Sequence, residues 1–276
     1  MEAHHLGEQM DHGNPPAGVD VEQPSSARIY DYYLGGDHHF AVDRAVADQV
    51  IAAWPDGLYI VRENRAFLRR AVRYLVQQGI RQFLDIGSGI PTVGNVHEVA
   101  HDLAPDARVV YVDIDPVAVA HSREILAGDG RVAVLQEDFF DPDAILGHTD
   151  TRRLLDLDAP VAVLVLGVLH FFPDRSAPGA VIARLRDAVS TGSYLALSHL
   201  TDESRPDLAR KVDEVYRDAN LPFYWRDHAQ IGELFTGWDL VDPGLVWVPK
   251  WHPDDPADPG ADPTASANYG GVARRA

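Results

Sequence analysis

The feature that most constrains this chain is a regular alternation of short apolar segments with segments of helical period. Strands buried on both faces of a sheet have near-continuous apolar sequences, and five short runs rich in β-branched residues fit that description. They are RQFLDI (81–86), RVVYVD (108–113), RVAVLQ (131–136), PVAVLVLGV (160–168) and SYLALSH (193–199). Helical patterns lie between them at residues 94–103, 116–126 and 176–190. The alternation predicts an α/β fold with a doubly wound, Rossmann-like sheet and right-handed crossovers.

Composition and charge exclude several classes of protein. The formal net charge of −18 repels phosphate backbones, so we expect no nucleic-acid partner. The chain contains no cysteine, which excludes disulfides and thiolate metal sites and fits a cytoplasmic protein. No apolar run reaches the roughly 18–20 residues of a membrane helix, and no signal-peptide pattern is present. We also find no metal-binding spacing, and therefore expect a cytoplasmic protein with neither a metal nor a membrane partner.

The organisation along the chain suggests three parts. Residues 1–23 are polar and without period, and we expect them to be disordered. Residues 24–80 carry helical patterns and are interpreted as a helical cap, whereas residues 81–276 hold the sheet and are interpreted as the core. Within the cap we predict a short helix that Ser25 or Ser26 caps, followed by helices over residues 41–53 and 61–78.

The first strand ends in a turn that suits a ligand. Asp85 is followed by Gly87-Ser88-Gly89, and ligands of doubly wound sheets bind at the carboxyl ends of the strands. A dinucleotide site requires G-x-G-x-x-G, but Thr92 stands at the third glycine position. Pro91 also removes an N–H group where a pyrophosphate needs donors. The turn permits close approach of a ligand but is poor for phosphate.

The next two strands end in further acidic residues. Asp113 ends the second strand, where an acidic residue typically accepts the ribose hydroxyls, and Ile114 follows it. Asp115 is the alternative, although Asp-x-Asp-Pro also fits a simple helix cap. After the third strand, the carboxylate of Asp138 can accept from an adenine amine and Phe139 can pack on the ring. These features indicate an adenosine-containing ligand.

At this point the sequence resembles class I S-adenosylmethionine-dependent methyltransferases. The segments FLDIGSG, YVDIDP, EDFFDP and VLVLGVLHFFPD carry the resemblance. PSSARIYDYYLGG, RENRAFLRRAVRYL and PGLVWVPKW are similar to one actinobacterial family of largely unassigned substrate, over about residues 24–276. The resemblance implies a seven-stranded sheet whose last strand, at about residues 269–274, is antiparallel. The pattern of residues 237–251 by itself fits either a kinked strand or a hairpin.

The resemblance also implies S-adenosylmethionine as the cofactor and a set of residues that bind it. Asp85 and residues 87–89 would face its methionine part, whereas Asp113, Ile114, Asp138 and Phe139 would hold the adenosine. Gly167 and Val168 would lie beside the sulfonium. A positive sulfonium without phosphate suits a site lined by carboxylates better than a pyrophosphate does.

The acceptor side of the site is less defined by the sequence. Arg28 or Arg62 of the cap could pair with the donor's carboxylate, and Tyr33 could contribute to the same pocket. His170 is the candidate general base, with His199 and Tyr33 as alternatives. We predict a methyltransferase with a small-molecule acceptor. A binding module without catalysis and a NAD-dependent oxidoreductase are the alternative functions.

Overall fold

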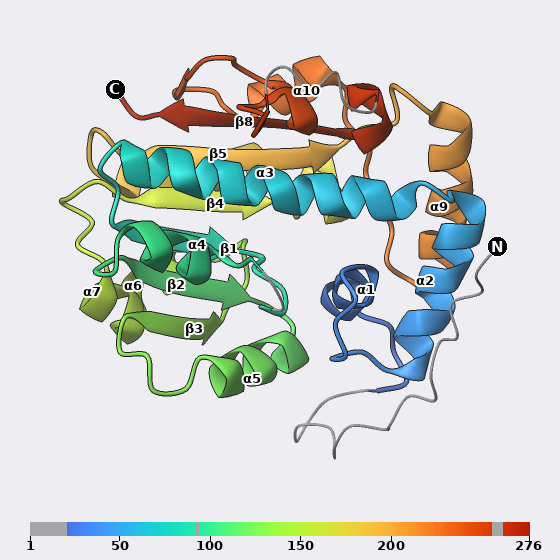
Figure 1. The fold of residues 1–276 in the computed structure, drawn as a ribbon, viewed down its shortest axis with the longest axis horizontal. Helices are drawn as coiled ribbons and strands as arrows, with labels where there is room; N and C mark the ends of the chain where they lie inside the picture. The colour runs from blue at the N-terminus through green and yellow to red at the C-terminus, as the bar shows by residue number, and fades with distance from the viewer. Residues whose placement is uncertain (1–20, 92–93, 256–261) are drawn as a thin grey trace.

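An eight-stranded sheet forms the centre of the structure (Figure 1). This computed structural model describes residues 21–91, 94–255 and 262–276, so Thr92 and the expected disorder of residues 1–20 lie outside the described residues. The strand order is β3-β2-β1-β4-β5-β8-β6, and β7 also pairs with β8. The strands are β1 Gln82–Ile86, β2 Arg108–Asp113, β3 Val132–Gln136, β4 Ala162–Leu166, β5 Tyr194–Leu200, β6 Asp239–Leu240, β7 Val246–Trp247 and β8 Asn268–Arg274.

The topology confirms the predicted doubly wound sheet with an antiparallel last strand. Strands β1 to β5 are parallel, and β8 runs antiparallel beside β5. The strand count differs from seven because residues 237–251 form two strands of two residues each. Strand β5 pairs with one edge of β8, and both β6 and β7 pair with its other edge. The two short strands β6 and β7 therefore together fill one position of the sheet.

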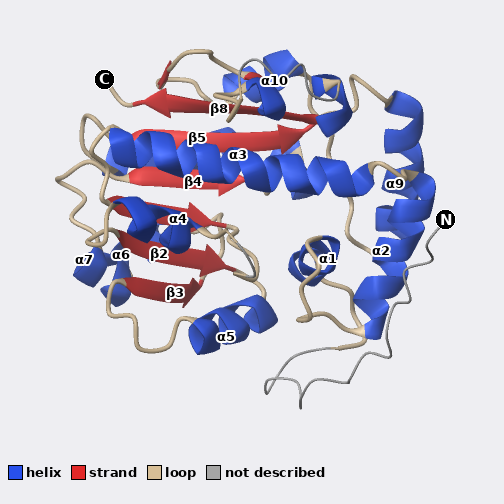
Figure 2. Cartoon of the chain, viewed as in Figure 1, coloured by secondary structure: helices blue, strands red, loops and turns tan. Residues whose placement is uncertain are grey.

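Helices cover both faces of the sheet, as Figure 2 shows for the face that carries α3. Alternate residues of each strand point to opposite faces: Phe83 packs with α3 and α4, whereas Leu84 packs with α6 to α8. The helices are α1 Ser26–Tyr33, α2 Ala41–Ala53, α3 Gly57–Gln77, α4 Val96–Leu103, α5 Pro116–Ile125, α6 Pro142–Gly147, α7 Thr149–Leu154, α8 Pro178–Ala188, α9 Pro206–Asp218 and α10 His228–Glu233.

Three helices lie beyond the carboxyl ends of the parallel strands (Figure 1). Helices α1, α2 and α9 share a hydrophobic cluster that includes Ile29, Val46 and Val212. Helix α3, although within the predicted cap, packs along the sheet through Phe67 and Leu75. Of the helices in residues 24–80, α3 therefore packs with the sheet, because its apolar face is long enough to cover it, whereas α1 and α2 pack with α9.

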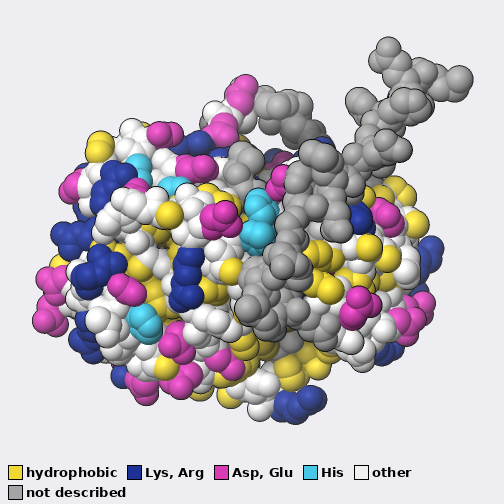
Figure 3. Space-filling model, turned by 90° about the horizontal axis from the view of Figure 1, so that it is seen from below, with side chains coloured by type: hydrophobic (Ala, Val, Ile, Leu, Met, Phe, Trp, Pro, Cys, Tyr) yellow, Lys and Arg dark blue, Asp and Glu magenta, His cyan; other side chains and the backbone are white. Residues whose placement is uncertain are grey.

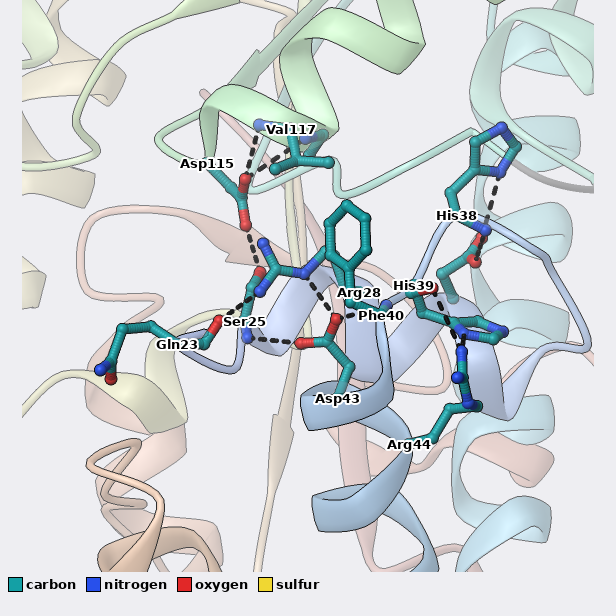
Figure 4. A network of polar contacts seen from close by, with 12 residues as sticks. Gln23, Ser25, Arg28, His38, His39, Phe40, Asp43, Arg44, Asp115 and Val117 are labelled. Atoms are coloured by element: carbon teal, nitrogen blue, oxygen red, sulfur yellow. Dashed lines mark hydrogen bonds and ion pairs between the residues drawn. The ribbon is translucent and has the colours of Figure 1, made fainter. Parts of the chain in front are cut away.

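A polar network fixes α1 against α2 and α5 (Figure 4). The Arg28 guanidinium donates to Asp43 at 2.7 Å, and both side chains are buried. Asp43 also accepts from the Ser25 backbone N–H at 2.9 Å. The Ser25 hydroxyl donates to Asp115, which caps α5. Ser25 is thus the residue before α1, as predicted, but its hydroxyl bonds α5 instead of capping its own helix.

The described side chains on the face below α1 and α5 carry charges of both signs. Over the described part of the face in Figure 3, basic and acidic side chains are interspersed with apolar ones. Such a face offers no continuous basic path for a phosphate backbone. Separately, no helix among the described residues is both long and apolar enough to cross a membrane.

Candidate functional site

A cavity of about 400 Å³ opens at the carboxyl ends of β1 to β4 and is covered by α1 and α9. This is where ligands bind in sheets of this topology. The predicted residues that line it are Tyr33, Asp85, Gly87, Ser88, Gly89, Asp113, Ile114, Asp138, Phe139, Gly167, Val168 and His170. Residues from four strand ends, which are distant in the sequence, thus meet at one site.

The glycine turn after β1 forms one wall of the cavity. Gly87 has a φ of 72°, and a Cβ atom there would lie 2.3 Å from Cγ2 of Val168. Gly89 has a φ of 62°, and its backbone N–H donates to Oδ2 of Asp113 at 2.7 Å. Both positions therefore require glycine, the first for lack of space and both for their left-handed backbone.

Asp113 lies at the end of β2 with both carboxylate oxygens facing backbone N–H groups. Oδ1 accepts from the backbone of Asp115 at 2.9 Å, and Oδ2 accepts from Gly89. Burial raises the pKa of Asp113 to about 6, although these hydrogen bonds oppose the shift. Asp115 caps α5 by accepting from the N–H groups of Val117 and Ala118, which is the alternative role considered for it.

The charge on Asp85 is influenced by an arginine that the sequence interpretation did not select for the site. Burial raises the pKa of Asp85 to about 7, while Arg65 on α3 lowers it and Asp113 raises it further. Arg65 is 8% exposed and lines the cavity. Its Nη1 donates to Asn95 at 3.3 Å, but its buried Nε has no hydrogen-bond partner among the described residues. Arg65 is thus a buried guanidinium whose Nε–H is available to a ligand.

The two arginines predicted for the donor's carboxylate are not among the residues that line the cavity, and their assignment to the donor stays a prediction. Arg28 is held by Asp43, so its charge is already paired inside the protein. Arg62 is exposed on α3. Arg65 follows Arg62 by three residues, which places it on a neighbouring face of the helix. The helical spacing of Arg62, Arg65 and Arg69 was visible in the sequence, but not which of them would be buried.

The residues after β3 contribute a carboxylate and a ring. Asp138 is exposed at the cavity mouth, and its Oδ1 accepts from the backbone of Phe140 at 2.9 Å. Phe139 is buried, and its ring stacks on Phe172 with centroids 5.6 Å apart. Together with Asp85, Asp113 and Glu137, Asp138 forms what we call the acidic part of the cavity.

A second group of lining residues, the aromatic part, consists of Tyr33, Phe171, Tyr216 and Phe223. The rings of Tyr216 and Phe223 lie 4.2 Å apart, and those of Phe171 and Phe223 lie 5.0 Å apart. The Tyr33 and Tyr216 hydroxyls are 3.4 Å apart. No local sequence pattern indicated Tyr216 or Phe223 as lining residues, because only the folded chain brings α9 and the following loop over the strand ends.

The three candidate bases differ in how they are held. Burial lowers the pKa of His199 to about 3, and Arg226 donates to its Nε2 at 2.6 Å, so this acceptor is occupied. Burial and the neighbouring Tyr216 raise the pKa of Tyr33 well above its usual value, so it stays protonated. His170 is 5% exposed, and its Nδ1 has no partner in the described part of the chain. Burial, followed by His199 and Arg226, lowers the pKa of His170 well below its usual value.

A parallel sheet with a glycine turn, a buried acid after β2 and a cavity over the strand ends defines the class of α/β enzymes that bind nucleoside-containing cofactors. Within that class, the chain belongs to a family of S-adenosyl methyltransferases, whose model matches residues 12–276. The protein is therefore a methyltransferase, and its cofactor is S-adenosylmethionine. A comparison with curated proteins found no match.

Solved structures agree with the family assignment. A DUF574 family protein from Streptomyces avermitilis is 42% identical with a TM-score of 0.89, covering 93% of this chain and 99% of that chain. A candidate methyltransferase from Thermobifida fusca is also 42% identical, with a TM-score of 0.88 and coverage of 95% and 98%. The pyocyanin biosynthetic protein PhzM, at 17% identity, has a TM-score of 0.51 over 79% of this chain and 57% of that chain, and it shows the shared fold alone.

Proposed function

We propose that this protein transfers a methyl group from S-adenosylmethionine to a small-molecule acceptor inside the cavity. The observation that carries the proposal is the cavity itself, which joins an acidic part to an aromatic part under one cover of helices. A volume of about 400 Å³ is in the usual range for small-ligand pockets, which span roughly 300–1,000 Å³. Its walls come from the strand ends and from helices α1, α3 and α9.

The residues of the acidic part fit the chemistry of the donor. Its sulfonium is positive, and carboxylates are the side chains that stabilise such a charge. The carboxylate of S-adenosylmethionine can accept a hydrogen bond from the unpartnered Nε–H of buried Arg65. The ribose hydroxyls of S-adenosylmethionine can donate to the Asp113 carboxylate. A pyrophosphate would instead face Asp85, Asp113 and two further acids, which is electrostatically unfavourable. The NAD-dependent alternative therefore has no support in this site.

The bound donor supplies an electrophilic methyl group, so the protein has mainly to align the acceptor and exclude water. Helices α1 and α9 cover the site, and their apolar contacts hold them there. Asn64 of α3 supports the cover, because its Nδ2 donates to the Tyr30 hydroxyl at 3.2 Å and its Oδ1 accepts from Ser198 at 2.6 Å. We assign to α1, α2 and α9 the role of the predicted cap.

Replacing Arg65 with alanine tests the assignment of the donor's carboxylate. We expect affinity for S-adenosylmethionine to fall about 10- to 100-fold, since a hydrogen bond to a charged group contributes about 1.5–3 kcal/mol. Calorimetric titration measures it. Arg62→Ala, three residues away and exposed, is the matched control and should leave the affinity unchanged. Equal effects of the two variants would show that Arg65 does not bind the carboxylate.

Donor affinity should also depend on pH. The pKa of Asp113 is raised to about 6, and only the ionised carboxylate accepts from both ribose hydroxyls. Its ionised fraction rises from about one tenth at pH 5 to about nine tenths at pH 7, so we expect roughly tenfold tighter binding at pH 7. Titrations across pH 5–8 measure this change. Affinity that is flat over that range, or that weakens as pH rises, would contradict the assignment.

A further inference from the structure

We propose that the acceptor is an aromatic compound without negative charge that bears a hydroxyl group, and that His170 takes the hydroxyl proton during transfer. This inference rests on the proposed function and names the substrate class of the same cavity. It follows from three observations on the cavity: the lining of its aromatic part, the distribution of charge, and two buried polar atoms without partners.

The aromatic part is suited to a flat ring system. Phe171 and Phe223 are stacked with an interplanar angle of 28°, and Tyr216 meets Phe223 edge-on at 82°. Aromatic pairs prefer such offset and edge-to-face arrangements, which an inserted planar ring can extend. Leu221 and Pro222 complete this side of the cavity. A saturated molecule of the same size would fill the space without these contacts.

The distribution of charge in the cavity disfavours an anionic acceptor. Among the described lining residues, the charged side chains are Arg65 and the four acids of the acidic part. The aromatic part has none, so a carboxylate placed there would lose its hydration without gaining a counter-ion. Burying an unpaired charge is costly enough to prevent binding. The acceptor therefore carries no negative charge when it binds.

Two buried polar atoms on the lining residues call for a hydrogen-bond donor. Nδ1 of His170 and Oδ1 of Asn268 both lack a partner within the described ranges, and these residues are 5% and 2% exposed. Buried polar groups are nearly always satisfied in native proteins, so such atoms in a cavity wall are sites for a ligand. Asn268 Oδ1 can only accept, and a neutral imidazole nitrogen can accept as well.

His170 lies between the two parts of the cavity. Its Cε1 is 4.0 Å from the position that a Cβ of Gly167 would occupy at the end of β4, and its ring centroid is 4.9 Å from that of Phe223. Arg226 holds the segment that carries it by donating to the carbonyl oxygens of Leu169 and Phe172, each at 2.9 Å. The imidazole is therefore fixed beside both the strand end and the aromatic part.

The hydroxyl proton passes to His170 while the acceptor oxygen forms its bond to the methyl carbon. The electron pair of the broken carbon–sulfur bond stays on sulfur. The products are a methyl ether, a neutral thioether and an imidazolium, which returns its proton to solvent when the site opens.

Calorimetry on protein saturated with S-adenosylhomocysteine tests the proposal with three probes: 2-naphthol, decahydro-2-naphthol and 2-naphthoate. We expect 2-naphthol to bind at least tenfold more tightly than the other two. Comparable or tighter binding of the saturated alcohol or of the carboxylate would overturn the proposed class, as would absence of binding by 2-naphthol. If S-adenosylhomocysteine itself does not bind, the proposed function fails as well, so the two failures are distinguishable.

His170→Gln tests the role of the imidazole. General-base catalysis contributes about 10²- to 10⁴-fold, so turnover of 2-naphthol to 2-methoxynaphthalene should fall at least about 100-fold. The binding of S-adenosylhomocysteine should not change, which excludes misfolding as the cause. His252→Gln is the matched control, because His252 is exposed and outside the cavity. Turnover by His170→Gln within threefold of the wild type would overturn the assignment.

Discussion

Replacement of Asp113 with alanine is expected to weaken S-adenosylmethionine binding by on the order of 10²- to 10³-fold. We assign both ribose hydroxyls of the donor to this carboxylate, and each hydrogen bond to a charged group contributes about 1.5–3 kcal/mol. Its loss also frees the Gly89 N–H, which Asp113 holds at 2.7 Å in the turn after β1. Isothermal titration calorimetry with S-adenosylmethionine and S-adenosylhomocysteine measures the loss, and NAD is the ligand expected not to bind.

The neighbouring Asp115 provides the control for this experiment. Its carboxylate caps α5 and does not line the cavity. Asn caps a helix about as well as Asp, so Asp115→Asn should preserve both the fold and the donor affinity within about threefold. A larger loss in Asp115→Asn than in Asp113→Ala would assign the ribose to Asp115. A loss below fivefold in Asp113→Ala would remove Asp113 from the donor site altogether.

The second large effect is expected on stability, at Asp43. This side chain is fully buried and accepts from Arg28 and from the backbone N–H groups of Ser25 and Phe40. Asp43→Ala leaves the buried Arg28 guanidinium without its counter-ion. Removing one partner of a buried pair typically costs about 3–5 kcal/mol. We therefore expect the free energy of unfolding, measured by urea titration, to fall by that amount.

Two further variants separate charge from hydrogen bonding in this network. Asp43→Asn keeps an oxygen for the backbone N–H groups but removes the charge, and should lie between the wild type and Asp43→Ala. Asp37→Ala is the surface control: its carboxylate is 70% exposed beside His38, so we expect a change within about 0.5 kcal/mol. If Asp43→Ala costs less than 1 kcal/mol, the Arg28–Asp43 pair is not what holds α1 against α2.

Helix α1 connects the expected effects on donor binding and on stability. Residues Ser26, Tyr30 and Tyr33 of α1 line the cavity, and the Arg28–Asp43 pair fixes the same helix to α2. Loosening α1 should therefore weaken donor binding in Asp43→Ala as well, without removing any group that we assign to the donor. We expect Asp113→Ala to leave the α1–α2 contact intact, because Asp113 lies in the sheet.

Features that depend on local pattern could be predicted from the order of the residues alone. The five parallel strands and helix α2 follow from apolar period and length, and α2 has the predicted bounds of 41 and 53. The glycine turn and the acidic residues near the ends of β1 and β2 could also be predicted as parts of a site, because the strand ends of a doubly wound sheet meet at one edge. These features require only the order of residues along one element.

Which side chains from distant segments are buried together became clear from the folded chain. Arg28 and Arg65 are both arginines of the N-terminal helices, yet one is neutralised by Asp43 and the other enters the cavity with a free donor. The placement of α9 over the strand ends, and with it Tyr216, had no local pattern to predict it. The physical reason is that helical period fixes which residues share a face, whereas the partner of that face is set by packing over the whole chain.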